Sequence, residues 1–156
     1  MQISDLQIIK ATMSNMEALL ALFLSYLDFY NRPAGTAEAE AFLRSRFEAD
    51  ESVVFLAMAG AEAVGFVQLY PTFSSLSLRR LWILSDLYVA EPARRRGIAK
   101  ALIRRAQELA LETHAEGLTL ETAVSNTAAQ RLYEQLGWRR DEDFFRYYRQ
   151  LNQVRD

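Results

Sequence analysis

The stretch from Leu81 to Lys100, LWILSDLYVAEPARRRGIAK, constrains the fold of this chain more than any other. An apolar, β-branched and aromatic run that ends near Val89 has the length of a strand. Pro92 stops this run, because proline has no amide hydrogen to give to a strand ladder. From Ile98 the apolar residues recur at three- and four-residue steps, which predicts a helix. The stretch therefore predicts a buried central strand, a short basic loop and a helix.

The basic loop that opens this helix has the composition of an anion-binding site. The first turn of a helix carries four backbone N–H groups without intrahelical partners, together with a partial positive charge. Gly97 and Ala99 leave these N–H groups uncovered, so a diphosphate can bind against them. Four basic side chains surround the same turn: Arg94, Arg95, Arg96 and Lys100. The alternative is an ordinary strand–helix junction whose arginines form a solvated basic face.

Two short motifs carry a resemblance to a known family. The first is Arg-x-x-Gly-x-Ala directly after the predicted strand, formed by Arg94, Gly97 and Ala99. The second is an Asn after the next strand, followed by a helix that carries a Tyr and ends in Leu-Gly-aromatic. Its members in this chain are Asn126, Tyr133, Leu136, Gly137 and Trp138. In this order and spacing, from Leu84 to Trp138, the chain resembles the GCN5-related N-acetyltransferase (GNAT) superfamily.

The resemblance implies a fold and a co-substrate. The implied fold is α/β, with a mixed, mostly antiparallel central sheet, a splayed central strand pair and helices on both faces. The implied co-substrate is acetyl-CoA, with its diphosphate on the basic loop and its pantetheine arm and thioester on the main chain of the splayed strand. The residues expected to bind it are Leu87, Tyr88, Val89, Arg94, Arg95, Arg96, Gly97, Ile98, Ala99, Lys100, Asn126 and Tyr133. Members of this family often pair as homodimers, so a homodimer is possible here.

Acetyl transfer to an amine needs a base for the incoming ammonium and benefits from an acid for the leaving thiolate. Tyr133 occupies the family's acid position, and a phenol with a pKa near 10 stays protonated at neutral pH. Its apolar helical face also fits an ordinary core tyrosine. The candidates for the base are Asp86 and Glu121, although either can instead be a structural hydrogen-bond acceptor. Some polyamine-acetylating relatives carry a Glu immediately before this aspartate, where this chain has Ser85.

The acceptor contacts are expected where the first helix ends. A capping pattern at Ser14 and Glu17 predicts a helix to about Tyr30. In the resembled family the following segment often borders the acceptor site, which makes three residues candidate acceptor contacts: Asp28, Tyr30 and Asn31. The alternative for each of them is a solvated turn.

The remaining pattern predicts a second helix, a hairpin and a late strand pair. Thr36 opens a helix through Glu48, and Gly117 precedes a short strand. The other expected segments are strands over Ser52–Ala59 and Val64–Tyr70, a connector over Pro71–Arg80, a helix over Ile98–Glu112, and a final antiparallel pair over Trp138–Arg140 and Phe144–Leu151.

Composition limits the classes of protein that are possible. A chain of 156 residues, 51% hydrophobic, is expected to form a single domain over residues 1–156. The net charge of −2 argues against nucleic acid as a partner. Without cysteine and with one histidine, His114, no metal site is expected. The longest uncharged stretch, Ala18 to Leu27, is too short to span a bilayer, so no membrane partner and a cytoplasmic location are expected.

The function that the resemblance implies is an acetyl-CoA-dependent N-acetyltransferase. Its acceptor is expected to be a primary amine of a small molecule (a polyamine, an amino acid or an aminoglycoside-like compound) or of a protein. The alternative is a non-catalytic acyl-CoA-binding sensor module with the same fold. A nucleotide hydrolase is not favoured, because the chain has no Gly-x-x-x-x-Gly-Lys-Ser/Thr segment.

Overall fold

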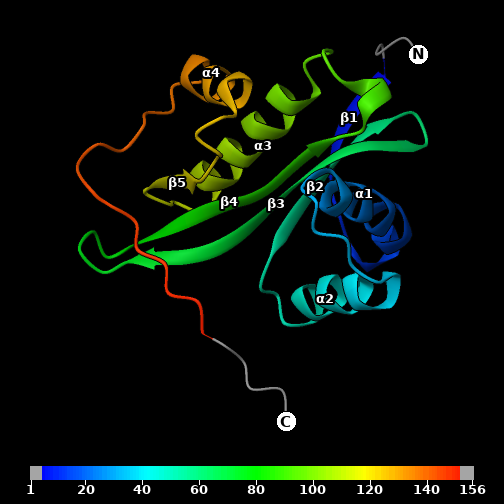
Figure 1. The fold of residues 1–156 in the computed structure, drawn as a ribbon, viewed down its shortest axis with the longest axis horizontal. Helices are drawn as coiled ribbons and strands as arrows, with labels where there is room; N and C mark the ends of the chain where they lie inside the picture. The colour runs from blue at the N-terminus through cyan, green and yellow to red at the C-terminus, as the bar shows by residue number, and fades with distance from the viewer. Residues whose placement is uncertain (1–4, 152–156) are drawn as a thin grey trace. The chain divides into compact units, whose positions relative to one another are not determined.

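The computed structural model describes residues 5–151 (Figure 1). The described chain divides into two compact units, one up to Glu121 and one from Thr122. The first unit contains β1 (Leu6–Lys10), α1 (Met16–Phe29), α2 (Thr36–Glu48), β2 (Val53–Ala59), β3 (Glu62–Ser74), β4 (Arg79–Val89), α3 (Ile98–Glu112) and β5 (Gly117–Leu120). The second contains α4 (Thr127–Gln135).

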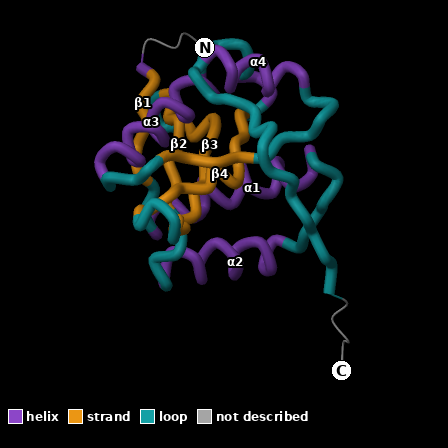
Figure 2. The backbone as a smooth tube through the Cα atoms, turned by 90° about the vertical axis from the view of Figure 1, so that its left-hand side faces the viewer, coloured by secondary structure: helices purple, strands orange, loops and turns teal. Residues whose placement is uncertain are grey.

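The first unit is a five-stranded sheet in the order β1-β2-β3-β4-β5. The first four strands pair antiparallel and β5 joins β4 in parallel, so the sheet is mixed and mostly antiparallel. In Figure 2 the strands lie between α3 on one side and α1 and α2 on the other. Both faces of the sheet are therefore covered, and the fold class that the sequence predicts is confirmed.

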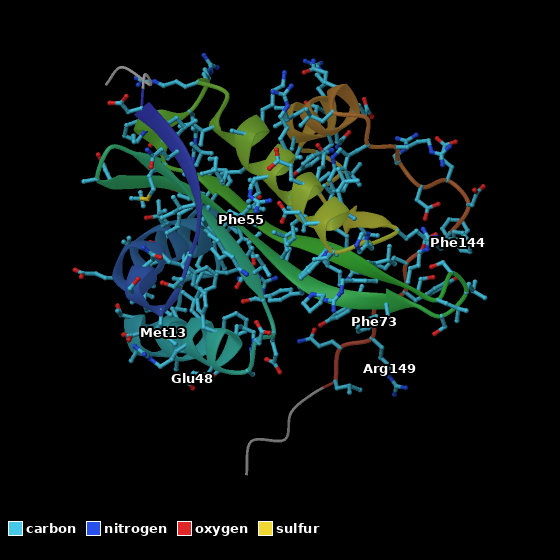
Figure 3. The ribbon with its side chains drawn as sticks, turned by 180° about the vertical axis from the view of Figure 1, so that it is seen from behind. Met13, Glu48, Phe55, Phe73, Phe144 and Arg149 are labelled. Atoms are coloured by element: carbon cyan, nitrogen blue, oxygen red, sulfur yellow. The ribbon has the colours of Figure 1, made fainter. Side chains whose placement is uncertain are left out.

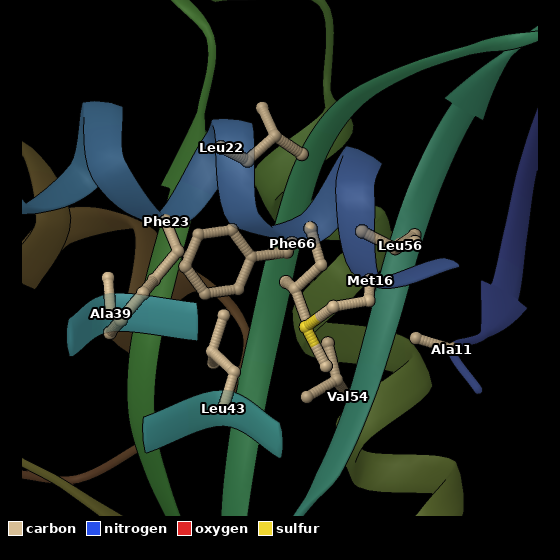
Figure 4. Packing of buried hydrophobic residues seen from close by; sticks show 10 residues of the cluster. Ala11, Met16, Leu22, Phe23, Ala39, Leu43, Val54, Leu56 and Phe66 are labelled. Atoms are coloured by element: carbon tan, nitrogen blue, oxygen red, sulfur yellow. The ribbon is translucent and has the colours of Figure 1, made fainter. Parts of the chain in front are cut away.

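Two apolar layers hold this arrangement together. On the α1 face, Phe66 of β3 packs edge-on against Phe23 of α1, with the ring centroids 6.3 Å apart (Figure 4). Leu43 of α2 closes this layer. On the α3 face, the Arg105 guanidinium lies 4.4 Å from the ring centroid of Phe55, the β2 residue labelled in Figure 3. These layers fix the positions of α1 and α3 on the sheet. They thereby fix the C-terminal end of α1 and the start of α3, which border the candidate site described below.

A β-bulge in β4 decides which residues of that strand face α1. The register of β3 and β4 shifts between Gln68 and Leu69, where Gln68 lies opposite Asp86 and Leu69 lies opposite Leu84. Ser85 is thus the extra residue. Successive strand side chains alternate between faces, so one extra residue moves every later side chain to the other face. Asp86 consequently faces α1, whereas Leu84 does not.

The central strand pair is splayed beyond this bulge. β5 pairs with β4 only over Leu81–Leu84, opposite Gly117–Leu120. The N–H of Ala90 donates to the oxygen of Val64 at 2.9 Å. Main-chain groups alternate in direction along an antiparallel strand. The N–H and C=O groups of Leu87 and Val89 therefore point away from β3, toward the open side.

Three expectations about local structure are wrong. Pro71–Arg80 is not a connector, because β3 runs to Ser74 and β4 begins at Arg79; Figure 3 places Phe73 in this long hairpin. The cap of the first helix lies earlier than expected, since the N–H of Thr12 donates to Asn15 Oδ1 at 2.9 Å ahead of a short 3-10 turn. The expected strands over 138–140 and 144–151 are not formed, because none of these residues joins a ladder in the described chain and a strand requires one.

Candidate active site

A cluster of polar side chains surrounds Asp86 on the α1 face of the sheet. Tyr26 Oη donates to Asp86 Oδ1 at 2.8 Å, and Gln68 Nε2 donates to Asp86 Oδ2 at 2.8 Å. Burial raises the pKa of the Asp86 carboxyl above its usual value of 3.8, while hydrogen bonds from Gln68, Tyr26 and Ser85 oppose that rise. Together with Tyr70, these residues form the carboxylate cluster (Tyr26, Gln68, Tyr70 and Asp86). Asp86 is thus a half-buried carboxylate with a raised pKa and two side-chain donors.

The two tyrosines of the carboxylate cluster stay protonated. Burial, and then the charge of Asp86, raise the pKa of Tyr26 above its usual value of 10.0. The same two causes raise the pKa of Tyr70, and the charge of Arg46 partly opposes this rise. Both phenols therefore stay protonated near neutral pH, where they can donate hydrogen bonds.

Aromatic rings from the end of α1 surround the same region. Tyr26 and Tyr30 meet edge-to-face with centroids 5.0 Å apart, and Phe29 lies 6.3 Å from Tyr88 of β4. Of the expected acceptor contacts, Tyr30 thus belongs to the aromatic group, while Asp28 and Asn31 are exposed at the end of α1. This aromatic group can contact the carbon chain or the cationic head of an amine.

Leu87 and Val89, the residues expected to contact the thioester and pantetheine, lie on the open edge of β4. Leu87 and Val89 direct their main-chain groups to the side that β5 leaves unpaired, and the oxygen of Val89 accepts from Arg94 Nε at 2.9 Å. The main chain of Tyr88 is turned toward Phe66 of β3 instead. An extended arm with amide groups can pair with this edge as an added strand does.

The basic loop (Arg94 to Lys100) joins this edge to α3. Arg95 and Gly97 have φ of 63° and 79°, in the left-handed region. Such turns gather N–H groups into a concave anion site. The first intrahelical bond of α3 runs from the N–H of Ala101 to the oxygen of Gly97 at 3.0 Å, so the preceding N–H groups, those of Ile98, Ala99 and Lys100, lack intrahelical partners.

The side chains of the basic loop divide into two groups. The Arg94 guanidinium lies 5.0 Å from the ring centroid of Phe29 and 5.6 Å from that of Tyr88. Arg95, Arg96 and Lys100 are exposed, whereas Ile98 is buried and anchors α3. A Cβ added at Gly97 would meet nothing within 4 Å. The space over the helix start therefore has room for a diphosphate, and the residues present fit one.

The second unit contains the other two expected cofactor residues. Asn126 caps α4, since its Oδ1 accepts from the N–H of Ala129 at 3.2 Å. The helix ends at Gly137, with φ of 88°, and the oxygen of Tyr133 accepts from the N–H of Trp138 at 3.0 Å. This Schellman motif explains the Leu-Gly-aromatic sequence. The rings of Tyr133 and Trp138 lie 5.9 Å apart, and Tyr133 is half-buried.

The other candidate base, Glu121, is exposed just after β5. Its burial therefore differs from that of Asp86, which carries the raised pKa. Sequence reasoning missed Gln68, Tyr26 and Tyr70. The available signal was Gln68, a single amide in the apolar run from Val64 to Tyr70.

A separate hollow of about 270 Å³ lies at the ends of β1, α2 and β2. Its lining includes Lys10, Asp50 and Ser52, and none of the residues of the carboxylate cluster, the basic loop or the open edge of β4. Within residues 5–151, no group of three or more metal-ligating side chains comes together. No helix in the same range is long and apolar enough to cross a membrane.

Comparison with known proteins identifies the class. A model described as the acetyltransferase (GNAT) family matches residues 18–138. The chain is 42% identical over 138 residues to the N-acetyltransferase YhfO of Bacillus subtilis, covering 88% of this chain and 93% of YhfO. A crystal structure of a probable acetyltransferase, also 42% identical, gives a TM-score of 0.89 and covers 94% of this chain and 98% of the other.

A more distant likeness concerns the fold alone. The aminoglycoside N-acetyltransferase AAC(6')-Iy, solved in complex with CoA, is 22% identical, with a TM-score of 0.78 over 94% of this chain and 95% of that chain.

The family model and the relatives at 42% identity together show that the protein is a GNAT-type acetyltransferase by fold and by sequence. The chain belongs to the GNAT family and is an enzyme with N-acetyltransferase activity.

Proposed function

We propose that this enzyme transfers the acetyl group of acetyl-CoA to a primary amine of a small molecule or a protein, with Asp86 as the base. The observation that carries the proposal is the half-buried Asp86 carboxylate, held by two donors at 2.8 Å beside the open edge of β4. A raised pKa suits a base that must accept a proton from an ammonium near neutral pH.

The amine must lose a proton before it can react. Deprotonation of a lysine-like ammonium with a pKa near 10.4 costs roughly 4.6 kcal/mol of free energy at pH 7. Asp86 accepts that proton, directly or through water, so that the nitrogen lone pair becomes available for attack. The aromatic group that includes Tyr30 binds the remainder of the amine, and the exposed Asp28 and Asn31 extend this surface.

The co-substrate supplies the acetyl group as a thioester. In this proposal, the N–H groups that Leu87 and Val89 direct to the open side hold the thioester oxygen and the pantetheine arm, and they stabilise the negative charge that develops on that oxygen. The basic loop binds the diphosphate through the N–H groups that open α3. CoA in the structure of AAC(6')-Iy, which has the same fold, supports this choice of co-substrate.

Tyr133 is proposed as the acid that protonates the departing thiolate. The support for this role is its place in the motif, seven residues after Asn126 on α4. Asn126 is proposed to hold pantetheine amides, since its side chain offers both a donor and an acceptor.

A CoA-release assay on the full chain tests this function against a non-catalytic acyl-CoA sensor. The chain has no cysteine, so a thiol-reactive dye reports free CoA without a background from the protein. We expect CoA release that depends on one class of amine in a panel of polyamines, amino acids, aminoglycosides and basic peptides. Acetyl-CoA binding by calorimetry, combined with no release above the uncatalysed rate for any amine, would favour the sensor.

A further inference from the structure

Gln68 is a buried amide in an otherwise apolar segment of β3. Its side chain is 0% exposed, like those of its neighbours Val67 and Leu69. Burying an amide is unfavourable unless its polar atoms find partners. The position of Gln68 in the middle of the sheet therefore needs an explanation from its contacts.

Those contacts satisfy only one end of the amide. Gln68 Nε2 donates to Asp86 Oδ2 at 2.8 Å, and the bulge at Ser85 places Gln68 directly opposite Asp86. Gln68 Oε1 is buried without a hydrogen-bond partner. An unpaired buried acceptor destabilises the fold, and an apolar side chain of the same shape would avoid that loss. Stability alone does not account for a glutamine here.

The partner of this amide is the carboxylate that also receives a hydrogen bond from α1. Tyr26 Oη occupies the other oxygen, Asp86 Oδ1, at 2.8 Å. The two donors come from different elements and bind different oxygens, so the carboxylate has little freedom to rotate. Both hydrogen bonds favour the ionised form, which burial disfavours.

We propose that Gln68 is a positioning residue, whose amide keeps the Asp86 carboxylate ionised and directed toward the acceptor amine. This inference rests on the proposed function, in which Asp86 is the base. In the step concerned, an N–H bond of the acceptor ammonium breaks and an O–H bond forms on Asp86. The bonding pair stays on nitrogen for attack on the thioester, and the proton later passes from Asp86 to solvent.

Within residues 5–151, the titratable groups that interact with Asp86 are the phenols of Tyr26 and Tyr70. Tyr26 approaches from α1 and Tyr70 from β3, and both phenols remain protonated because their pKa values are raised. Tyr30 acts on Tyr26, and Arg46 of α2 acts on Tyr70 with its permanent positive charge. A titration observed at Asp86 therefore reports the ionisation of its own carboxyl group, with the hydrogen-bond donors that remain in each variant, and not the ionisation of a neighbouring phenol.

The test compares the ionisation of Asp86 in the wild type and in Gln68→Met. The measurement is the ¹³Cγ chemical shift of Asp86 as a function of pH, and the Asp86→Asn variant assigns the Asp86 signal. Met preserves the size of Gln without the donor. We expect the midpoint to rise by roughly one to two pH units, the contribution of one charge-assisted hydrogen bond. The acid limb of kcat/KM should move upward equally, with the Kd for acetyl-CoA unchanged. An unshifted midpoint would overturn the inference.

Two further variants separate lost donation from lost polarity. Gln68→Asn keeps an amide that is too short to reach Asp86, so its midpoint should also rise. Gln7→Met is the matched control, because Gln7 is exposed on β1, and it should leave the midpoint unchanged. A rise in Gln68→Met without one in Gln68→Asn would contradict a role for the donated hydrogen bond.

A double-variant cycle addresses catalysis. In an Asp86→Asn background, Gln68→Met should cause no further loss of kcat, because its effect passes through Asp86. Fully additive losses would overturn the inference. The titration needs no turnover, so the two proposals fail separately. A raised midpoint in a protein that releases no CoA would contradict the proposed function, whereas an unshifted midpoint in an active enzyme would contradict only the role of Gln68.

Discussion

Asp86 of the carboxylate cluster and the basic loop lie on the same strand–loop–helix segment, yet the two regions are built in opposite ways. In the cluster, the buried Gln68 and the half-buried Tyr26 fix Asp86 through two hydrogen bonds of 2.8 Å. In the loop, the contacts on offer are main-chain N–H groups, and the side chains of Arg95 and Lys100 are exposed. Shifting a pKa requires removal from water, whereas binding a diphosphate from solution requires donors that remain open. In the proposed function, proton transfer therefore belongs to the cluster and cofactor binding to the loop.

The largest effect is expected outside both regions, at Tyr133. If Tyr133 is the general acid, Tyr133→Phe should lower kcat by roughly two to four orders of magnitude and leave acetyl-CoA binding intact. A packing tyrosine would lose little, because Phe keeps the ring that lies 5.9 Å from Trp138. Steady-state kinetics of the Tyr133→Phe variant decide between a general-acid role and a packing role. Tyr147→Phe, at an exposed tyrosine, is the control. More than half of wild-type kcat in a folded variant would remove the assignment.

Asp86→Asn should lower kcat by about a hundredfold, near the lower end of what a positioned base contributes. The side chain keeps its size, and the Gln68 amide can rotate so that its unpaired oxygen accepts from the new Asn, which preserves the fold. The acid limb of the pH profile should disappear with the carboxyl. Kinetics across pH are the measurement, with the exposed Asp143→Asn as the control. An unchanged acid limb would mean that another group, such as Glu121, is the base.

A smaller effect is expected at Asn126, whose oxygen caps α4. Asn126→Ala should raise the KM for acetyl-CoA several-fold and cost about 1 kcal/mol of stability through the lost cap. Asn126→Asp keeps a capping oxygen but replaces the amide donor with a negatively charged carboxylate oxygen, so it tests the donor separately from the cap. If Asn126→Asp matches the wild type in KM, capping is the whole role of this residue.

The smallest effect concerns stability. Because burial raises the pKa of Asp86, the folded protein binds more protons than the unfolded chain between the usual value of 3.8 and the raised one. The unfolding free energy of the wild type should therefore fall as pH rises through that window. Asp86→Asn removes this term, so its curve should show a smaller fall. Urea unfolding at several pH values measures the difference, and parallel curves would contradict the raised pKa.

Local patterns in the sequence predicted well the secondary structure that carries the proposed cofactor residues. The helix expected over Ile98–Glu112 has the same bounds in the structure, because apolar periodicity and the glycine before it are local signals. The position of Asn126 before α4 and of Gly137 after it follows from capping chemistry, which is also local.

The contacts of the carboxylate cluster could not be predicted in the same way. The bulge at Ser85 turns Asp86 toward Tyr26, which lies 60 residues earlier in the chain. No local pattern reports such a contact, so Gln68 and Tyr26 were missed. The expected strand over Phe144–Leu151 had the right composition, but pairing depends on a partner that composition does not specify.

Calorimetric titration of acetyl-CoA into two variants tests the division of labour between the regions most directly. Gly97→Glu puts a negative charge into the open space over the start of α3 and should abolish binding, whereas Asp86→Asn should bind like the wild type. Gly97→Asn is the control for backbone strain, since Asn tolerates the φ of 79° at this position, and it should still bind. Unchanged affinity in a folded Gly97→Glu protein, or lost affinity in Asp86→Asn, would contradict the account.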